Sequence, residues 1–440
     1  MKLAAYFNRQ KHIAPLATFR VAFGLLMLCS IVRFWSKGWI VTQYITPQYF
    51  FTYYGFDWVK PFGQVGMYVA FALMAISAFF MAIGLFYRYS SILLFLLFTY
   101  VELIDKSNYL NHYYFVSLVA FLMIFLPANA YYSVDAKLGF VKSRTKIPAW
   151  SIDILKLQLG ITYFYAGIAK LNADWLLNAL PLKMWLPAKS HIPIIGKLMS
   201  YKWTAYIFSW FGAFYDLTIA FFLLWNKSRW LAYTAVIAFH IMTAILFPIG
   251  MFPYIMIGAT LIFFSEDFHK KLWAFFGFPS TSTEVDRMVK KTPKAVSYFL
   301  VIYIVIQLLI PFRYLLYPGK LFWHEQGYRF SWRVMLMEKA GYTSFTLVEK
   351  AHGKSMKVDA SEYLTPVQVK MMSSQPDMIL QFSHHLRDQF KPAFGEIAVY
   401  ANSFVTLNGS GSKKFVNDSI NLCSQKRGFH NKTWILPYND

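Results

Sequence analysis

The sequence predicts a polytopic all-α membrane domain with about nine transmembrane helices, followed by a smaller extracytoplasmic α+β domain that is rich in strands. Of its 440 residues, 57% are hydrophobic and only 15% are charged, a composition far too apolar for an ordinary soluble domain. Stretches of roughly twenty apolar residues recur up to residue 317. From about residue 319 the sequence becomes mixed and polar, with the alternation typical of strands. We therefore expect a transmembrane domain over residues 1–318 and an extracytoplasmic domain over residues 319–440.

The expected spans follow from hydrophobic length, because a helix of about twenty apolar residues crosses a bilayer. An odd number of spans places the termini on opposite sides, and segments facing one side then carry about twice as many lysines and arginines. By the positive-inside rule, we expect a cytoplasmic N-terminus and a periplasmic or lumenal C-terminal domain. The expected spans lie at about 14–34, 65–86, 90–104, 110–128, 152–171, 204–225, 229–247, 250–264 and 295–317.

Two hairpins are expected in the C-terminal domain. Residues 343–348 and 355–358 alternate in polarity and flank a turn at Gly353. Residues 397–407 are expected to pair with 414–416 around a turn whose glycines supply positive φ angles. The C-terminal domain is therefore expected to contain a sheet.

Three further segments have characteristic patterns. Residues 366–390 have helical spacing, with Thr365 as the expected N-cap and Pro376 as an interruption. Residues 174–202 are amphipathic and are expected to lie in the membrane interface. Residues 265–294 are polar and are expected to form a cytoplasmic connector.

Composition and motifs exclude several classes of function. The formal charge of +22 is typical of loops that face an anionic membrane surface, so we expect membrane lipid and no nucleic acid as a partner. No glycine-rich phosphate loop, dinucleotide fingerprint or metal-ligand motif occurs, which predicts that the protein uses no nucleotide and no metal. Cys29 and Cys423 are either joined in an oxidising compartment or are two unrelated thiols.

Two groups of polar residues stand at the outer ends of expected spans. Residues 105–112 precede the fourth span and end in Asn111 and His112, and residues 166–175 close the fifth span and contain Lys170. The fourth span runs inward and the fifth returns outward, so the expected topology brings the two groups to the same depth. Ionisable residues at such positions are candidates for function, because they are costly to place there.

Lys170, His112 and Asn111 each have a functional and a structural interpretation. A desolvated lysine can act as a base in its amine form; alternatively, Lys170 extends to the interface beside Asp174 as an anchor. His112 can transfer protons or be a hydrogen-bonded structural residue. Asn111 can bind a substrate oxygen or cap the local helix. His240 is expected to be structural, bonding across to a tyrosine or threonine.

The sequence resembles the vitamin K-dependent γ-glutamyl carboxylase family and its bacterial members, which share the horizontally transferred transmembrane (HTTM) domain. Asn111-His112 and Ser133-Val134-Asp135 look like two of the family's segments. The stretch from Ala166-Gly167 through Lys170 to Asp174-Trp175 looks like its Ala-Gly-x-x-Lys-Leu-x-x-Asp-Trp segment. The matching segments are 105–114, 127–135, 165–175, 328–335, 375–378 and 434–437.

The resemblance implies an activity that the residues alone do not give. Members oxidise a vitamin K hydroquinone, here phylloquinol or menaquinol, with dioxygen, forming the epoxide. The oxygenated product is a base strong enough to remove a γ-proton from protein glutamate, and carbon dioxide then traps the carbanion. The implied partners are a lipid-soluble quinone and a glutamate-containing protein or peptide. The implied location is the bacterial inner membrane.

The resemblance also implies roles for residues. Lys170 is expected to deprotonate the hydroquinone, with His112 as a proton partner and Asn111 as a hydrogen-bonding group for the quinone. The expected substrate-binding residues are Asp105, Tyr109, Tyr328, Ser331, Trp332 and Met335.

Departures from the animal members leave alternatives open. Where those members have an acidic residue after the Ser-Trp pair, this chain has Arg333, and their His-x-Arg is replaced by Met337-Glu338-Lys339. One alternative is a quinol epoxidase that acts on another acceptor. The other is a non-catalytic transporter or binding protein on the same fold; it is disfavoured because no twofold hydropathy repeat occurs.

Overall fold

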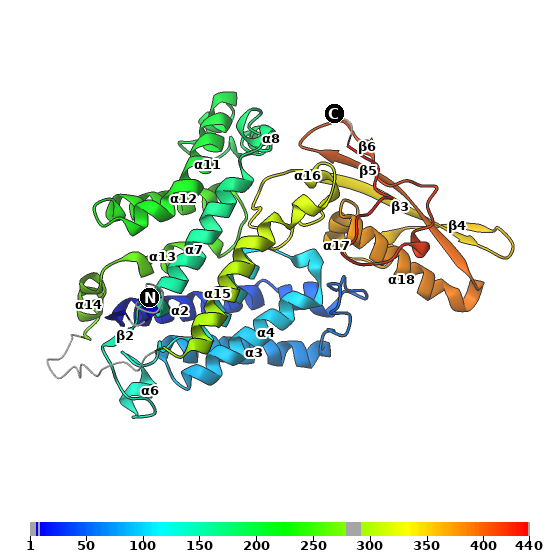
Figure 1. Cartoon of the computed structure of the whole chain (residues 1–440). Coiled ribbons are helices and arrows are strands. Elements are labelled where there is room, and N and C mark those ends of the chain that lie inside the picture. The colour runs from blue at the N-terminus through cyan, green and yellow to red at the C-terminus, as the bar shows by residue number, and fades with distance from the viewer. Residues whose placement is uncertain (1–5, 8, 279–291, 439–440) are drawn as a thin grey trace.

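The computed structural model describes residues 6–7, 9–278 and 292–438 as a large helical part joined to a smaller part built on a sheet (Figure 1). In the helical part, α2 (Ala14–Ser36) packs against α3 (Gly63–Ile83), which packs against α4 (Tyr87–Ile104), while α7 (Trp150–Ala169) packs against α11 (Lys202–Leu224). The other helices of this part are α5 (Asn111–Phe125), α6 (Val134–Lys137), α8 (Ala173–Leu176), α9 (Leu182–Trp185), α10 (Gly196–Met199), α12 (Arg229–Leu246), α13 (Phe252–Thr260), α14 (Glu266–Phe275) and α15 (Lys294–Leu309). Two short strands, β1 (Gln10–His12) and β2 (Lys146–Pro148), pair antiparallel beside α2.

All nine expected spans coincide with helices, but the count of nine is not confirmed. Six helices among the described residues are long and apolar enough to cross a membrane: α2, α3, α4, α11, α12 and the stretch Lys294–Leu316. These six indicate a membrane protein. The expected cytoplasmic N-terminus was argued from an odd number of spans, so it stays a prediction.

The other three expected spans are too short or too polar to be candidates for crossing a membrane. Helix α5 has 15 residues and would span only about 22 Å, because Pro127 disfavours helical geometry in the residue before it. Helix α13 has 9 residues before it tightens into a 3₁₀ turn. Helix α7 has 20 residues, but Asp153, Lys156 and Gln158 dilute its apolar character.

The C-terminal part is an antiparallel sheet covered by helices. Its strand order is β4-β3-β5-β6, formed by β3 (Lys339–Glu349), β4 (Ser355–Val358), β5 (Ile397–Leu407) and β6 (Lys413–Lys414). Both expected hairpins are confirmed: Phe345 pairs with Val358, and Val405 pairs with Lys413. The second turn has the positive φ angles expected of Asn-Gly, 50° at Asn408 and 76° at Gly409.

The expected helical segment is also present, as two helices. Helix α17 (Pro366–Met372) begins at a capping box in which the Thr365 and Gln368 side chains bond to each other's backbone amides. Helix α18 (Pro376–Phe394) begins at the expected interruption. It packs against β5 (Figure 1). The Phe382 ring of α18 lies 5.2 Å from that of Phe345 on β3. A short α16 (Leu321–His324) leads into this part.

The remaining expectations on organisation have mixed outcomes. Cys29 and Cys423 are both free, so they are not joined to each other. Residues 174–202 form the short helices α8, α9 and α10, and Trp175 and Leu182 belong to one hydrophobic cluster with Phe345 of the sheet. The proposed boundary at residue 319 stays a prediction, and residues 279–291 of the expected connector lie outside the described residues.

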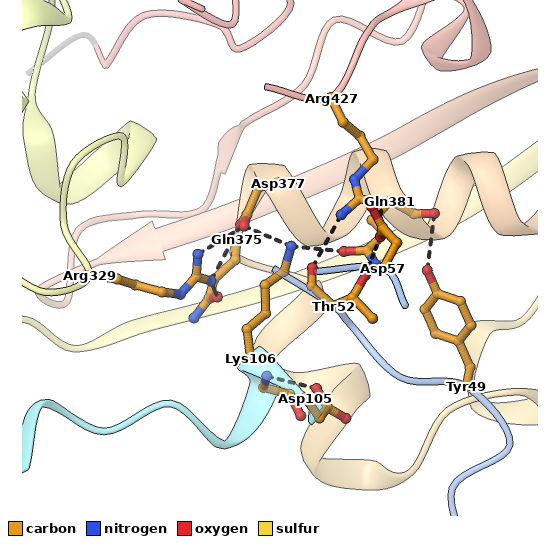
Figure 2. A network of polar contacts seen from close by, with 11 residues as sticks. Tyr49, Thr52, Asp57, Asp105, Lys106, Arg329, Gln375, Asp377, Gln381 and Arg427 are labelled. Carbon is orange, nitrogen blue, oxygen red and sulfur yellow. Dashed lines mark hydrogen bonds and ion pairs between the residues drawn. The ribbon is translucent and has the colours of Figure 1, made fainter. Parts of the chain in front are cut away.

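A polar network joins the C-terminal part to the loop after α4 (Figure 2). The Lys106 Nζ atom lies 2.9 Å from Asp377 of α18 and donates a 2.8 Å hydrogen bond to Gln381. Arg329 approaches the same Asp377 carboxylate at 2.8 Å and donates to Gln375. The segments that meet here are far apart in the sequence, so the network fixes the loop after α4 relative to α18.

Asp377 is the common acceptor of this network. Burial alone would raise its pKa, but Arg329 and Lys106 together hold it well below its usual range. Burial lowers the pKa of Lys106 to about 8, although Asp377 opposes this shift. At neutral pH the carboxylate therefore stays ionised between two cations whose charges it offsets.

We expect Asp377→Asn to lower the free energy of unfolding by about 3–5 kcal/mol, because it leaves buried Lys106 and Arg329 without a counter-charge. The matched control is Asp388→Asn on the same helix, whose partner Arg387 lies at an exposed surface. The control should cost less than about 1 kcal/mol. Thermal denaturation of detergent-solubilised protein measures both, and equal shifts in melting temperature would contradict this account.

Candidate functional site

Two adjoining chambers are candidates for the functional site. The larger of the two lies where the helical part meets the segment that leads into the sheet. It has a volume of about 660 Å³ and is lined by the loop before α5, the start of α5, residues 248–251 and residues 325–339. Tyr109, Asn111, His112, Tyr328 and Met335, all named from the sequence, line it. Its volume lies in the range of about 300–1,000 Å³ that is usual for ligand sites.

Tyr109 and Asn111 form hydrogen bonds to the backbone of residues 330–333, at the far side of this chamber. The Tyr109 hydroxyl donates to Asn111 Oδ1 at 2.9 Å and accepts from the backbone N–H of Phe330 at 2.6 Å. The Asn111 amide donates to the carbonyl of Arg333 at 2.9 Å. Asn111 therefore ties the first turn of α5 to residues 330–333, in addition to facing the chamber.

The segment held in this way is conformationally strained. Phe330, Trp332 and Met335 have φ angles of 59°, 60° and 53°, which side chains with a β-carbon rarely adopt. Each such residue costs on the order of 1–3 kcal/mol and persists only where the surroundings enforce it. The hydrogen bonds from Tyr109 and Asn111 supply part of that enforcement.

A second, smaller chamber of about 120 Å³ contains Lys170. Lys170 follows the last turn of α7, and its Nζ atom lies 2.5 Å from Asp216 Oδ2 on α11. Both side chains are buried, and the walls are mainly apolar and aromatic. Lys170 does not pair with Asp174, which instead accepts from Asn408 at 3.0 Å and lies near Lys320.

Gly167 explains why the ion pair forms at this place. A β-carbon there would lie 2.7 Å from the backbone nitrogen of Leu217, so α7 and α11 can cross this closely only with glycine at the contact. Asp216 is the neighbour of Leu217 on α11. The close crossing brings its carboxylate within reach of Lys170, one turn further along α7.

The two chambers share a wall formed by Trp185, Ile249, Val334 and Met335. His112 lines the larger chamber, and its ring stacks on Phe252, which lines the smaller one, at 5.2 Å between centroids. The two sequence clusters thus lie on either side of one partition. The hydrogen bond expected between His240 and a tyrosine is present, because its Nε2 atom lies 2.9 Å from the Tyr163 hydroxyl, and His240 also lines the smaller chamber.

Three residues expected to bind substrate line neither chamber. Asp105 accepts from the backbone of Ser107 and from Gln368, so it joins the loop to α17. The Ser331 hydroxyl bonds to backbone carbonyls of its own segment, at Gly327 and Tyr328. Trp332 is fully buried, with its ring 5.0 Å from that of Tyr114.

Two residues that line the chambers, Asp216 and Arg333, are not among the site residues expected from the sequence. Asp216 is an acidic residue inside an expected span, a position that predicts a partner, but its distance from Lys170 in the sequence does not identify that partner. Arg333 was noted only as a departure from the family pattern, yet it lines the larger chamber. Among the residues that the structure describes, no group of three or more histidine, cysteine or acidic side chains is placed to hold a metal ion.

Comparisons with known proteins assign both parts of the chain. The sequence model of the HTTM domain matches residues 8–268. The model described as "vitamin K-dependent gamma-carboxylase, lumenal domain" matches residues 292–440, which indicates an extracytoplasmic C-terminal part. No solved structure matches the chain significantly.

We expect Tyr109→Phe to destabilise residues 325–335 by about 1–3 kcal/mol, because it leaves the buried N–H of Phe330 without an acceptor. Tyr113→Phe is the matched control, since Tyr113 lines the same chamber without a hydroxyl hydrogen bond of this kind. Limited proteolysis followed by mass spectrometry measures cleavage within 325–335. Equal protection in the two variants would contradict the proposed clamp.

Proposed function

Because this chain belongs to the vitamin K-dependent gamma-carboxylase family, we propose that it oxidises a vitamin K hydroquinone with dioxygen and carboxylates protein glutamate with carbon dioxide. The observation that carries the proposal is the buried Lys170–Asp216 pair in an apolar chamber that adjoins a larger one with several charged side chains in its lining. The smaller chamber provides a base away from bulk water. The larger chamber provides room for a polar acceptor.

Lys170 is proposed to take the proton of the hydroquinone hydroxyl. Asp216 Oδ2 accepts a 2.5 Å hydrogen bond from the Lys170 Nζ atom, which holds the amine in place inside the apolar chamber. In its unprotonated form this amine can act as a base. Asp216 orients the amine and stabilises the ammonium ion that forms, without touching the substrate itself.

The smaller chamber fits an aromatic ring, because Phe208, Phe239 and Phe252 line it. At about 120 Å³ it is smaller than a usual site for a complete ligand, about 300 Å³ or more. We therefore infer that a bound quinone extends past Met335 and Val334 into the larger chamber. Phylloquinol and menaquinol share the ring that this arrangement requires.

The larger chamber is proposed to receive the glutamate side chain. Tyr328 and Met335 line it beside the shared wall, so an acceptor there lies next to the reacting ring. His112 lies at the same partition through its contact with Phe252 and is the proposed proton partner. The proposed reaction requires that little water reaches the reacting carbon, which would otherwise be reprotonated before it meets carbon dioxide.

The proposal is tested with purified protein supplied with reduced vitamin K, bicarbonate, dioxygen and a glutamate-rich peptide labelled from ¹⁴C-bicarbonate. We expect epoxide and peptide-bound label together, and Lys170→Ala should lower both rates by about 10²–10⁴-fold. Lys183→Ala is the matched control, because this lysine donates to the Tyr206 hydroxyl outside both chambers. The control should leave both rates unchanged.

Other outcomes identify the competing functions. Epoxide without labelled peptide would support a quinol epoxidase that acts on another acceptor, which the departures at Arg333 and residues 337–339 favour. Neither product from folded protein would support a non-catalytic membrane protein on the same fold. Equal loss in Lys170→Ala and Lys183→Ala would remove the specific role of Lys170.

Asp216→Asn should lower kcat by about a hundredfold through loss of amine orientation, with little change in KM for the peptide. We expect KM for the peptide to change little because Asp216 lines only the smaller chamber, whereas the peptide is proposed to bind in the larger one. Asp153→Asn is the control: Asp153 lies in the first turn of α7, 2.5 Å from Lys11. A raised peptide KM with unchanged kcat in Asp216→Asn would assign Asp216 to acceptor binding instead.

A further inference from the structure

Arg333 is a buried cation without a counter-ion at the wall of the larger chamber. Its residue is 8% exposed, its Nε atom has no hydrogen-bond partner, and it lines the chamber. Among the residues that the structure describes, no carboxylate lies within 4 Å of its guanidinium. The guanidinium lies 4.4 Å from the ring centroid of Tyr314 and also hydrogen-bonds to the Tyr314 side chain, which offsets part of its lost hydration without supplying a counter-charge.

The chamber as a whole carries excess positive charge. Two acidic residues line it, Glu325 and Glu338. The cationic residues that line it are Arg33, Lys106, Arg329, Arg333, Lys339 and Lys370. Such a lining favours an anionic ligand and disfavours a cationic one.

Most of the buried cations already have acidic partners. Lys339 pairs with Glu325 at 2.8 Å, and Lys106 and Arg329 share Asp377. Arg33 lies only partly buried, 5.0 Å from the Trp39 ring. Arg333 is therefore the buried cation of this lining whose charge the described residues leave without a carboxylate.

An unpaired buried charge is costly, typically several kcal/mol, and an aromatic ring returns only about 2 kcal/mol. A carboxylate can use the planar donor edge of a guanidinium through two parallel hydrogen bonds. Binding such a ligand would therefore supply the counter-charge that the protein itself does not.

The position of Arg333 is also fixed before any ligand binds. Its carbonyl accepts the 2.9 Å hydrogen bond from Asn111, and it lies between the strained residues Trp332 and Met335. Met335 belongs to the partition between the two chambers. An anion at Arg333 would thus lie close to the chamber that contains Lys170.

We propose that Arg333 forms a carboxylate-binding subsite that selects an acidic side chain of the acceptor over its neutral amide. This inference rests on the proposed function, because it takes the acceptor to be a glutamate-containing peptide. Bicarbonate offers the same chemistry from a second source, so the test must separate the two. If Arg333 only stacks on Tyr314, the protein will show no preference between a glutamate and a glutamine side chain.

The first test measures binding and needs no turnover. Fluorescence anisotropy compares a labelled peptide with one glutamate in an otherwise uncharged sequence and the same peptide with glutamine, at constant ionic strength. Wild-type protein should prefer the glutamate peptide. Arg333→Gln should weaken its binding about ten- to a hundredfold, from about 1.5–3 kcal/mol for a charge-assisted hydrogen bond, and leave the glutamine peptide unchanged.

Two further variants keep the test decisive. Arg333→Lys should recover part of the preference, since a lysine keeps the charge but not the forked geometry. Lys350→Gln is the matched control and should keep the preference, because it removes a cation that pairs with Glu396 at an exposed surface outside both chambers. The proposal is overturned if wild-type protein shows no preference, if Arg333→Gln keeps it, or if both peptides weaken equally.

The second test separates the two sources of carboxylate. In the carboxylation assay, Arg333→Gln should raise KM for the peptide about ten- to a hundredfold and leave KM for bicarbonate unchanged. The reverse pattern would overturn the proposal in favour of a bicarbonate site. If the protein does not carboxylate but shows the Arg333-dependent preference for glutamate, the proposed function is wrong and the subsite is supported. If the protein carboxylates but Arg333→Gln leaves peptide binding unchanged, the proposed function is supported and the subsite is wrong.

Discussion

Burial of ionisable groups among apolar helices is the constraint on which the rest of the structure depends. An isolated charge there is expensive, so each must be paired by groups that the fold brings together. Lys170 and Asp216 meet 2.5 Å apart because α7 and α11 cross at Gly167, where a larger side chain would collide with Leu217. The pair is therefore a product of helix packing, and any change that separates the helices also leaves two buried charges uncompensated.

The segment between α16 and the sheet is likewise stabilised by groups that lie elsewhere in the chain. Residues 330–335 hold three unfavourable φ angles, and the energy that maintains them comes from outside the segment. Tyr109 and Asn111 bind its backbone from the start of α5, while Arg329 is held by Asp377 of α18. The helical part and the C-terminal part thus both fix the wall that divides the two chambers, so neither part completes the site alone.

The sequence predicted features that depend on local signals and failed where the outcome depends on packing. The Asn408-Gly409 turn and the Thr365 cap follow from residues a few positions apart, and both are present. The count of nine spans is not confirmed, with six candidates among the described residues, because hydrophobicity alone does not distinguish a membrane span from a short apolar helix such as α5. Ser331 and Trp332 line neither chamber, because the Ser331 hydroxyl bonds to carbonyls of its own segment and the Trp332 ring packs against Tyr114, contacts that no local pattern predicts.

The division into two chambers has a consequence for the chemistry. Under the proposed function, the oxygenated quinone formed beside Lys170 takes the proton from carbon and must not meet water, whereas an acidic acceptor needs polar groups that bind its charge. One continuous cavity would mix these requirements, because cations that bind a carboxylate also attract water. Here Lys170 lies among aromatic side chains on one side of Met335 and Val334, and the excess positive charge lies on the other. The partition keeps the two environments apart at a single wall, as the proposed coupling of oxidation and carboxylation requires.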